Sequence, residues 1–368
     1  MTEAAGPLTG LRVVDMTTLA MGPLAAQILG DYGADVIKVE SPAGDPFRNT
    51  LPTRSPGMGH VFLQLNRNKR SLAIDLKAPA TRPVMRRLVE KADIFLSNVR
   101  PAAMAGLALD YATVRGSNPG LIYCAAYGFS ERGPYAGRPA ADDTIQAMSG
   151  LVSLHARATG SPQLAATVVA DKAVGLTAVH AILAAVIHRM KTGEGQFIEV
   201  PMFETMVAFV LPEHLGGQAY LPPSGPSGYN RIINPMRRPF ATKDGYLCVL
   251  PYTTPQWHRF FRLIGRDDLV ADPALADPVS RNARLEELYG LIAQAMPART
   301  TKEWVADLIA ADILFGEMLS VEDLLHDPHL DALGMFPIHE HPTEGQIRLI
   351  GQPVQSCRPS SANTVSKC

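Results

Sequence analysis

An aspartate stands at the start of the longest helical pattern in the chain. Asp171 follows the apolar stretch 165–170 and is predicted to open a nearly uncharged helix over residues 171–190. A carboxylate at a helix N-terminus accepts backbone N–H groups and meets the positive end of the helix dipole, so we expect Asp171 to stay ionised at neutral pH. Such a residue is either an ordinary N-cap or a carboxylate nucleophile, and the local pattern leaves both open.

Other common catalytic patterns are missing from the sequence. The turn after the first predicted strand, residues 17–23, is not a GxGxxG loop, and the sequence contains no Walker A motif and no GxSxG elbow. The pairs His326/His329 and His339/His341 lack further ligands nearby, so we interpret them as surface or loop histidines and predict no metal site.

The elements that must position Asp171 follow an alternating pattern. An apolar strand at 11–15, a helix at 21–32 and a strand at 34–40 form a βαβ unit, which favours a parallel sheet with Rossmann-like winding. The helix at 171–190 should end at Gly193, which occupies a C′ position. Further strands are expected at 70–76, 92–96, 120–126 and 196–200, with helices at 81–91 and 142–154, the last with an acidic N-cap.

A change in amino-acid composition divides the chain. Proline and glycine cluster between residues 212 and 239, which indicates a linker or active-site loop. Beyond it, a strand at 246–251 and helices at 256–265, 281–296 and 301–310 indicate a smaller α+β domain, and one more strand is expected at 346–350. We therefore expect a large α/β domain over 1–211, a linker and glycine-containing loop over 212–230, a small domain over 231–334, and a return segment with a polar tail over 335–368.

Composition limits the partners. The 368 residues carry a formal net charge of -1, so no basic field attracts nucleic acid or an anionic membrane. The longest apolar run, 173–187, has 15 residues, which is too few to span a bilayer. The 4 cysteines form no CxxC pair, and the N-terminus shows no signal peptide, so we expect a cytoplasmic protein.

Several motifs occur together in a recognisable order. They include GLRVVD at 10–15, LGDYGADVIKVE at 29–40, LNRNKRS at 65–71, KTGEGQ at 191–196 and FATKDG at 240–245, and they extend to DPHL at 327–330. In these motifs and in their order, the chain resembles the class III CoA-transferases of the CaiB/BaiF type. That family includes formyl-CoA transferase-like enzymes and α-methylacyl-CoA racemases.

The resemblance implies a function and a mechanism. Asp171 matches the family's nucleophile, which would form an acyl anhydride and then an aspartyl-CoA thioester while CoA passes from an acyl-CoA donor to a carboxylic acid acceptor. CoA is then a substrate, with no permanent cofactor, and the family forms interlocked homodimers. Two alternatives stay open: racemase-type proton transfer on a CoA ester, and a non-catalytic CoA-binding protein. Against the racemase, Ala141 stands where those enzymes carry histidine.

The resemblance also implies binding residues. The expected CoA contacts are Thr18, Leu19, Ala20, Met21, Lys69, Arg70, Ile74, Lys77, Asn98, Val99, Arg100 and Tyr127. Ser41 and Gly106 stand where some relatives carry arginine, so the adenine end of CoA would be held differently. Gly225 and Gly228 are expected in a mobile cover, and Arg237 and Arg238 beside it are predicted to bind a second carboxylate of a dicarboxylic acid, or else to hold the linker.

Overall fold

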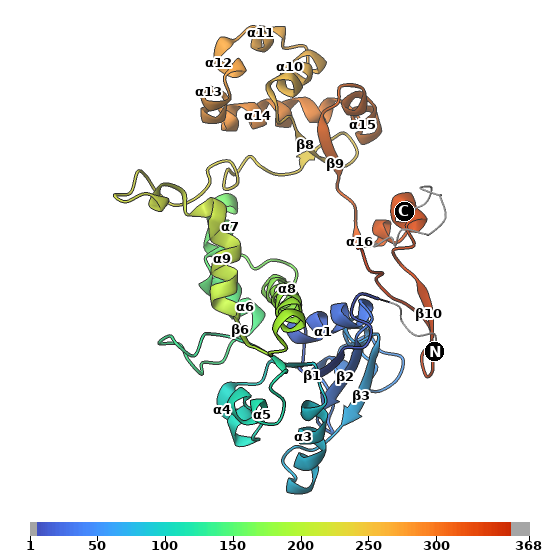
Figure 1. The fold of residues 1–368 in the computed structure, drawn as a ribbon. Coiled ribbons are helices and arrows are strands. Elements are labelled where there is room, and N and C mark those ends of the chain that lie inside the picture. Colours follow the sequence, from blue (N-terminus) through green and yellow to red (C-terminus); the bar gives the residue numbers. More distant parts are fainter. Residues whose placement is uncertain (1–5, 355–368) are drawn as a thin grey trace. The chain divides into compact units, whose positions relative to one another are not determined.

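The computed structural model describes residues 6–354 and divides the chain into two compact units (Figure 1). Among the described residues, the first unit comprises 6–152, 164–212 and 329–354. The second comprises 153–163 and 213–328, so it is inserted into the chain of the first.

A six-stranded parallel sheet forms the centre of the first unit. The strand order is β3-β2-β1-β4-β5-β6, the order of classical doubly wound folds, and this confirms the predicted α/β class. Strands β4 and β5 are buried on both faces, as expected for central parallel strands. The strands are β1 (Arg12–Met16), β2 (Asp35–Glu40), β3 (Lys69–Ala73), β4 (Ile94–Ser97), β5 (Ile122–Tyr127) and β6 (Phe197–Pro201).

Helices cover both faces of this sheet. On one face, α1 (Met21–Asp31) and α8 (Val169–Thr192) pack against each other and against the strands. On the other, Met85, Val89, Met104 and Val114 form a buried cluster with apolar residues of the sheet. These four residues come from α3 (Arg82–Glu90), α4 (Pro101–Gly106) and α5 (Tyr111–Arg115). The remaining helices of the first unit are α2 (His60–Leu65), α6 (Asp142–Met148) and α9 (Met202–His214), the last reaching into the second unit.

Helix α8 is the structural centre for the candidate site. Gly193 follows it with φ 78°, the left-handed C-cap that the sequence predicts. By length and composition α8 would also be able to cross a membrane. Its buried face, which includes Val174, Ala178, Ile182 and Ala185, instead packs inside the first unit, as in a core helix of a globular protein.

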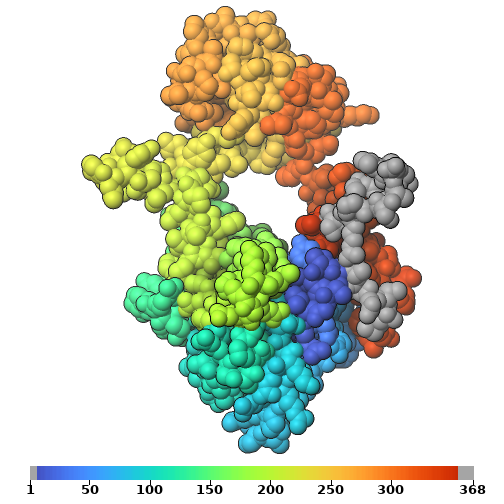
Figure 2. Space-filling view, in the orientation of Figure 1, coloured from blue at the N-terminus to red at the C-terminus, as the bar shows by residue number. Residues whose placement is uncertain are grey.

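The C-terminal part of the chain returns to the first unit as a hairpin of β10 (Ile338–His341) and β11 (Gly345–Arg348). Only the second of these strands is predicted from the sequence. Figure 2 shows the red hairpin residues beside blue N-terminal ones, and hydrogen bonds join them. Arg54 donates to the carbonyl oxygen of Glu344, and Arg67 donates to that of Ile350.

The second unit combines a small antiparallel sheet with helices. Its strands are β7 (Phe240–Ala241), β8 (Tyr246–Leu250) and β9 (Leu314–Glu317). Trp257, Phe260, Leu288 and Trp304 belong to its buried core. The helices are α7 (Leu151–Thr159, mostly in this unit), α10 (Thr254–Leu263), α11 (Asp267–Val270), α12 (Pro273–Ala276), α13 (Pro278–Ala283), α14 (Leu285–Ala295), α15 (Thr301–Ala310) and α16 (Val321–Leu324), and α17 (Pro328–Ala332) follows at the boundary.

Candidate active site

Asp171 is the third residue of α8, not its N-cap. The helix begins at Val169, and the residue before it provides no side-chain cap. The expectation that Asp171 caps the helix is therefore wrong. The cap comes from a distant residue, because Asp142 Oδ1 accepts the backbone N–H of Asp171 at 3.0 Å. This bond satisfies one of the four N–H groups that a helix N-terminus leaves free.

Helix α6 fixes the entry to α8 through two buried polar side chains. Asp142 is 7% exposed and Gln146 is fully buried. Gln146 donates its amide to Asp142 Oδ2, and its oxygen accepts the backbone N–H of Ala165 at 2.9 Å. The predicted helix over 142–154 is interrupted at Gly150, whose φ is 89°, and Asp142 is its first residue with Ala141 as N-cap. The short α6 thereby holds the segment that leads to Asp171.

The environment of the Asp171 carboxylate disfavours its charge. Burial raises its pKa to about 6, and the nearby Asp142 carboxylate adds to the effect by repulsion. Among residues 6–354, no hydrogen-bond donor reaches the Asp171 side chain. At pH 7 the carboxylate is thus mostly ionised but poorly solvated, the state in which an oxygen nucleophile is most reactive.

A glycine one turn further along α8 brings Asp171 close to the loop between β1 and α1. A Cβ at Gly175 would lie 2.7 Å from the carbonyl oxygen of Met21, so the two backbones touch there. Residues four apart share one face of a helix, so Asp171 lies on the face of α8 that meets the start of α1. The four predicted CoA contacts Thr18, Leu19, Ala20 and Met21 belong to this loop and to the first residue of α1.

The loop after β4 meets the loop after β1. Asn98 accepts the backbone N–H of Thr18 at 3.1 Å and donates to its carbonyl oxygen at 2.9 Å. Two groups of predicted CoA contacts, distant in sequence, are thereby joined at the carboxyl ends of neighbouring strands. Ligands of doubly wound sheets bind at this edge.

The four predicted phosphate partners differ in their surroundings. The ammonium of Lys69 is buried and donates to Asp15, to the carbonyl oxygen of Pro23 and to Asn66, which leaves it no proton for a ligand in this arrangement. Burial lowers its pKa to about 8, while the Asp15 carboxylate opposes that shift. Arg70 pairs with Asp35 on the surface. The side chains of Lys77 and Arg100 are exposed and have no partner among the described residues.

Three other predicted CoA contacts are apolar or aromatic. Ile74 is buried just beyond β3. Val99 and Tyr127 line a cavity of about 680 Å³ together with Tyr111, Tyr123 and Phe197. The Tyr127 hydroxyl donates to Glu199 at 2.7 Å, so its polar end is already satisfied.

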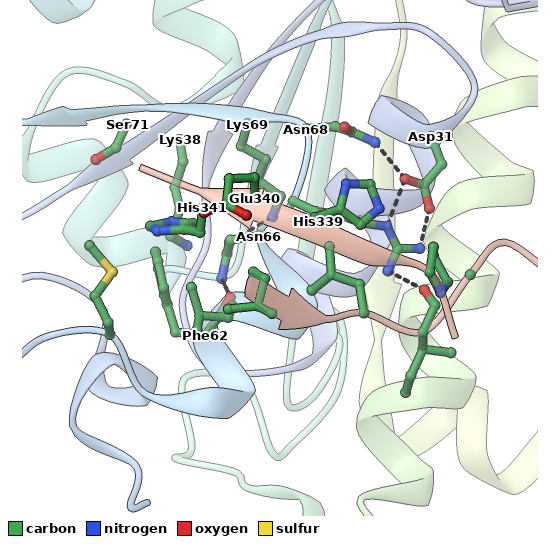
Figure 3. Close-up of a pocket in the computed structure, with 18 of the residues that line it drawn as sticks. Asp31, Lys38, Phe62, Asn66, Asn68, Lys69, Ser71, His339, Glu340 and His341 are labelled. Atoms are coloured by element: carbon green, nitrogen blue, oxygen red, sulfur yellow. Dashed lines mark hydrogen bonds and ion pairs between the residues drawn. The ribbon is translucent and has the colours of Figure 1, made fainter. Parts of the chain in front are cut away.

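A cavity that the sequence did not predict lies between the C-terminal hairpin and the N-terminal region of the first unit. It has a volume of about 510 Å³ and is lined on one side by Lys38, Lys69 and Ser71, and on the other by His339 and His341 of β10 (Figure 3). The described residues contain no cluster of histidine, cysteine or carboxylate side chains arranged to bind a metal ion. The sequence signal for this cavity is weak, because the hairpin and the helix α2 opposite it lie far apart in the chain.

The predicted cover and substrate residues belong to the second unit. Gly228 has φ 109°, and its N–H donates to the carbonyl oxygen of His214 at 2.7 Å. The carbonyl oxygen of Gly225 accepts a hydrogen bond from the Gln218 side chain at 2.7 Å. Arg237 and Arg238 line a cavity of about 230 Å³ with Cys248 and Tyr289.

The fold and the site define a class of protein. A doubly wound parallel sheet with loops gathered at its carboxyl edge, and a poorly solvated carboxylate beside them, is typical of an α/β enzyme that acts on a nucleotide-containing substrate. The chain belongs to CoA-transferase family III, which it matches over residues 8–363. It is therefore a CoA-transferase, which moves CoA between an acyl-CoA and a carboxylic acid.

Individual relatives agree with this assignment. The chain is 35% identical over 323 residues to a probable fatty acyl-CoA transferase of Mycobacterium tuberculosis, covering 84% of this chain and 82% of the relative. It is 33% identical to a succinate–glutarate CoA-transferase of Agrobacterium fabrum, covering 89% and 84% of the two chains. A crystal structure of an aspartate-to-alanine variant of the M. tuberculosis protein superposes with a TM-score of 0.82 at 31% identity, covering 96% and 93%.

Proposed function

We propose that Asp171 is the nucleophile of the transfer reaction. The observation that carries this proposal is its partly buried carboxylate, which has a pKa near 6 and no hydrogen-bond donor among the described residues. A hydrogen-bonded carboxylate would lose nucleophilicity, whereas this oxygen gives up little solvation on attack. The neighbouring loop 17–21, with its predicted CoA contacts, would hold the thioester within reach.

The proposed steps conserve all atoms and need no external oxidant or proton source. An Asp171 oxygen attacks the donor thioester carbonyl, the C–S bond breaks, and a mixed anhydride and CoA thiolate result. The thiolate attacks the Asp171 carbonyl carbon of the anhydride and releases the donor carboxylate, which leaves an aspartyl-CoA thioester. The acceptor carboxylate attacks the carbonyl carbon of this thioester, the C–S bond breaks, and a second mixed anhydride and CoA thiolate result. The thiolate then attacks the acceptor acyl carbonyl, which gives the new acyl-CoA and releases Asp171 as the carboxylate.

The test is to find CoA on the nucleophile. The protein is incubated with succinyl-CoA without acceptor, quenched in acid and digested, and the peptide carrying Asp171 is analysed by mass spectrometry. We expect a CoA adduct on this peptide that disappears after addition of an acceptor acid. The Asp171→Asn variant should show neither adduct nor transfer. A CoA adduct on another residue, or normal turnover by this variant, would contradict the proposal. A racemase would leave no adduct.

We propose that the acids exchanged are short dicarboxylates. The relative from A. fabrum acts on succinate and glutarate according to its name, and Arg237 and Arg238 lie beside a small cavity. Guanidinium groups pair with carboxylates in a two-pronged geometry, which suits the carboxylate that does not react. CoA itself is a substrate in this scheme.

Acceptor competition tests this specificity. Succinate, glutarate and a monocarboxylate of equal length are compared in a transfer assay with wild type, Arg237→Ala and Arg238→Ala. We expect wild type to prefer the dicarboxylates, and at least one variant to lose that preference through a higher acceptor KM. A preference of wild type for monocarboxylates, or an unchanged ranking in both variants, would refute the dicarboxylate assignment without affecting the role of Asp171.

We propose that the protein works as an interlocked homodimer, as the family resemblance implies. Helix α8 carries the exposed apolar side chains Leu176, Ile187 and Met190, which are 54%, 55% and 81% exposed. Apolar groups gathered on one helix are typical of an interaction surface. Sedimentation at micromolar concentration should therefore give twice the mass of one chain, and a monomer would contradict the proposal.

A reducing cytoplasm is the location we propose. Cys124 and Cys248 are both free thiols, Cys124 buried and Cys248 exposed, while Cys357 and Cys368 lie outside the described residues. Free thiols are the usual state of cysteine in that compartment. Fractionation of the producing cell should recover the activity with cytoplasmic markers.

A further inference from the structure

The loop between β1 and α1 is held through its backbone by buried polar side chains. Lys38 donates to the carbonyl oxygen of Thr17 at 2.9 Å, and Asp15 accepts the Thr17 N–H at 3.1 Å. Asp45 accepts the N–H of Leu19 at 3.3 Å. Together with the two bonds between Asn98 and the Thr18 backbone, these contacts fix three consecutive residues of the loop.

Lys38 and Asp45 also pair with each other in the interior. Lys38 Nζ lies 3.0 Å from Asp45 Oδ2, and the two side chains are 1% and 0% exposed. Asp45 itself is oriented by the N–H of Phe47, which donates to Oδ1 at 2.9 Å, and by Glu40, which accepts the Asp45 N–H at 3.0 Å. A buried ion pair adds little stability compared with well-packed apolar residues, so its value lies in the geometry that it imposes.

The loop needs such support because its conformation is strained. Leu19 has φ 68°, in the left-handed region that residues with a Cβ disfavour, and its side chain is 43% exposed. A residue keeps such a backbone only where its surroundings hold it there. Two hydrogen bonds do so on both sides of the strained peptide unit: Asn98 donates to the Thr18 carbonyl oxygen, and the Leu19 N–H donates to Asp45.

We propose that Asp45, together with Lys38, is a positioning residue that presets the loop 17–20 for CoA binding. Neither side chain is exposed, so they act through the loop and do not touch the substrate. Lys38 also lines the floor of the cavity beneath the hairpin, next to Lys69 (Figure 3). The inference rests on the proposed CoA contacts in this loop, and it adds the residues that keep those contacts in place.

The decisive variant replaces both charges with apolar side chains of similar shape, Lys38→Met with Asp45→Leu. Removing both partners avoids leaving an unpaired buried charge, so the fold should be retained. The matched control is Arg67→Met with Asp31→Leu, which removes another largely buried ion pair of the same unit (15% and 6% exposed). Further hydrogen bonds of this pair join Arg67 to the Ile350 carbonyl oxygen and Asn68 to Asp31, away from residues 17–20. Circular dichroism and thermal melting verify the fold of both variants.

Binding of CoA is measured by titration calorimetry, and transfer kinetics are measured with succinyl-CoA and an acceptor acid. We expect the first double variant to bind CoA about tenfold more weakly and to raise the acyl-CoA KM by a similar factor, since two loop hydrogen bonds are lost. Its kcat and its acceptor KM should stay within about threefold of wild type, because Asp171 is untouched. The control should keep the wild-type affinity for CoA.

Two results would overturn the inference: wild-type CoA affinity in the first double variant, or an equal loss of affinity in the control. If the first double variant does not fold, Lys38→Met with Asp45→Asn decides, because it leaves no buried charge unpaired and removes the loop bond from Lys38 to Thr17, while it keeps a polar side chain beside Leu19. An unchanged CoA affinity in that variant would also overturn the inference. Failure of the wild type to bind CoA would instead fault the proposed function.

Discussion

Replacing Asp171 by asparagine should stabilise the protein at pH 7 while abolishing transfer. Burial, helped by the Asp142 carboxylate, raises the pKa of Asp171 from its ordinary value of 3.8 to about 6. The folded state therefore binds a proton that the unfolded state releases between these two pH values. The contribution of Asp171 to the free energy of unfolding therefore falls as the pH rises from about 4 to about 6, and it does not recover at higher pH.

The size of the effect follows from the shift. About two pKa units correspond to roughly 3 kcal/mol of lost stability above pH 6, as an upper limit. Because Asp171 is only partly buried, we expect asparagine to recover about 1–2 kcal/mol at pH 7.5. No cap is lost in the exchange, since the backbone N–H of residue 171 still donates to Asp142.

The assay is thermal or urea unfolding of wild type and Asp171→Asn over pH 4 to 7.5. The advantage of the variant should shrink several-fold as the pH is lowered to about 4, where Asp171 is protonated in the folded state and close to half protonated in the unfolded state. Asp31→Asn is the matched control, and its effect on stability should have the opposite sign. Asp31 is paired with Arg67, so loss of its charge should destabilise the folded protein at pH 7. Destabilisation by Asp171→Asn at pH 7.5, or an effect that does not vary with pH, would refute the reasoning.

Three further outcomes are expected. The kcat/KM of transfer should rise with pH through about 6 as Asp171 loses its proton. Asp142→Asn should move this rise to lower pH, because it removes the repulsion between the two carboxylates. A pH profile that the variant leaves in place would contradict that repulsion. Gly175→Ala should destabilise by about 1–3 kcal/mol and reduce activity, because its Cβ would press on the backbone of Met21. Gly290→Ala, in open space within α14, should instead be neutral or stabilise by up to about 1 kcal/mol, and equal melting shifts in both glycine variants would refute the packing argument. Mutating the exposed Arg100 to Gln should raise the acyl-CoA KM without changing that of the acceptor, and unchanged kinetics would remove it from the CoA site.

Local patterns predicted the fold well where one segment determines its own structure. The strand, helix and strand over residues 11–40 and the end of α8 at Gly193 follow from apolar periodicity and glycine chemistry. The geometry of the site was harder to predict from the sequence, because its decisive contact joins Asp142 and Asp171, which are 29 positions apart. An acidic residue followed by glutamine four positions later is a faint signal that many surface helices share.

The same limit explains the other differences. Lys69 is buried because its ammonium pairs with Asp15 of another strand. A local sequence pattern shows only that the residue carries a positive charge. The hairpin strand β10 contains two histidines and a glutamate, which are poor strand formers, and it forms because it pairs with β11. In each case the tertiary partner decides, and no local spacing reveals it.

The insertion of the second unit has a consequence for synthesis on the ribosome. All six strands of the parallel sheet have been made once β6 ends at Pro201, yet the hairpin that Arg54 and Arg67 bind begins about 140 residues later. At roughly 5–20 residues per second, the N-terminal region waits about 7 to 27 seconds for that cover. During this interval the apolar side chains Phe62 and Leu63, which line the cavity under the hairpin, face solvent or a chaperone. A nascent chain stalled before residue 338 should therefore expose this patch, and the completed chain should bury it.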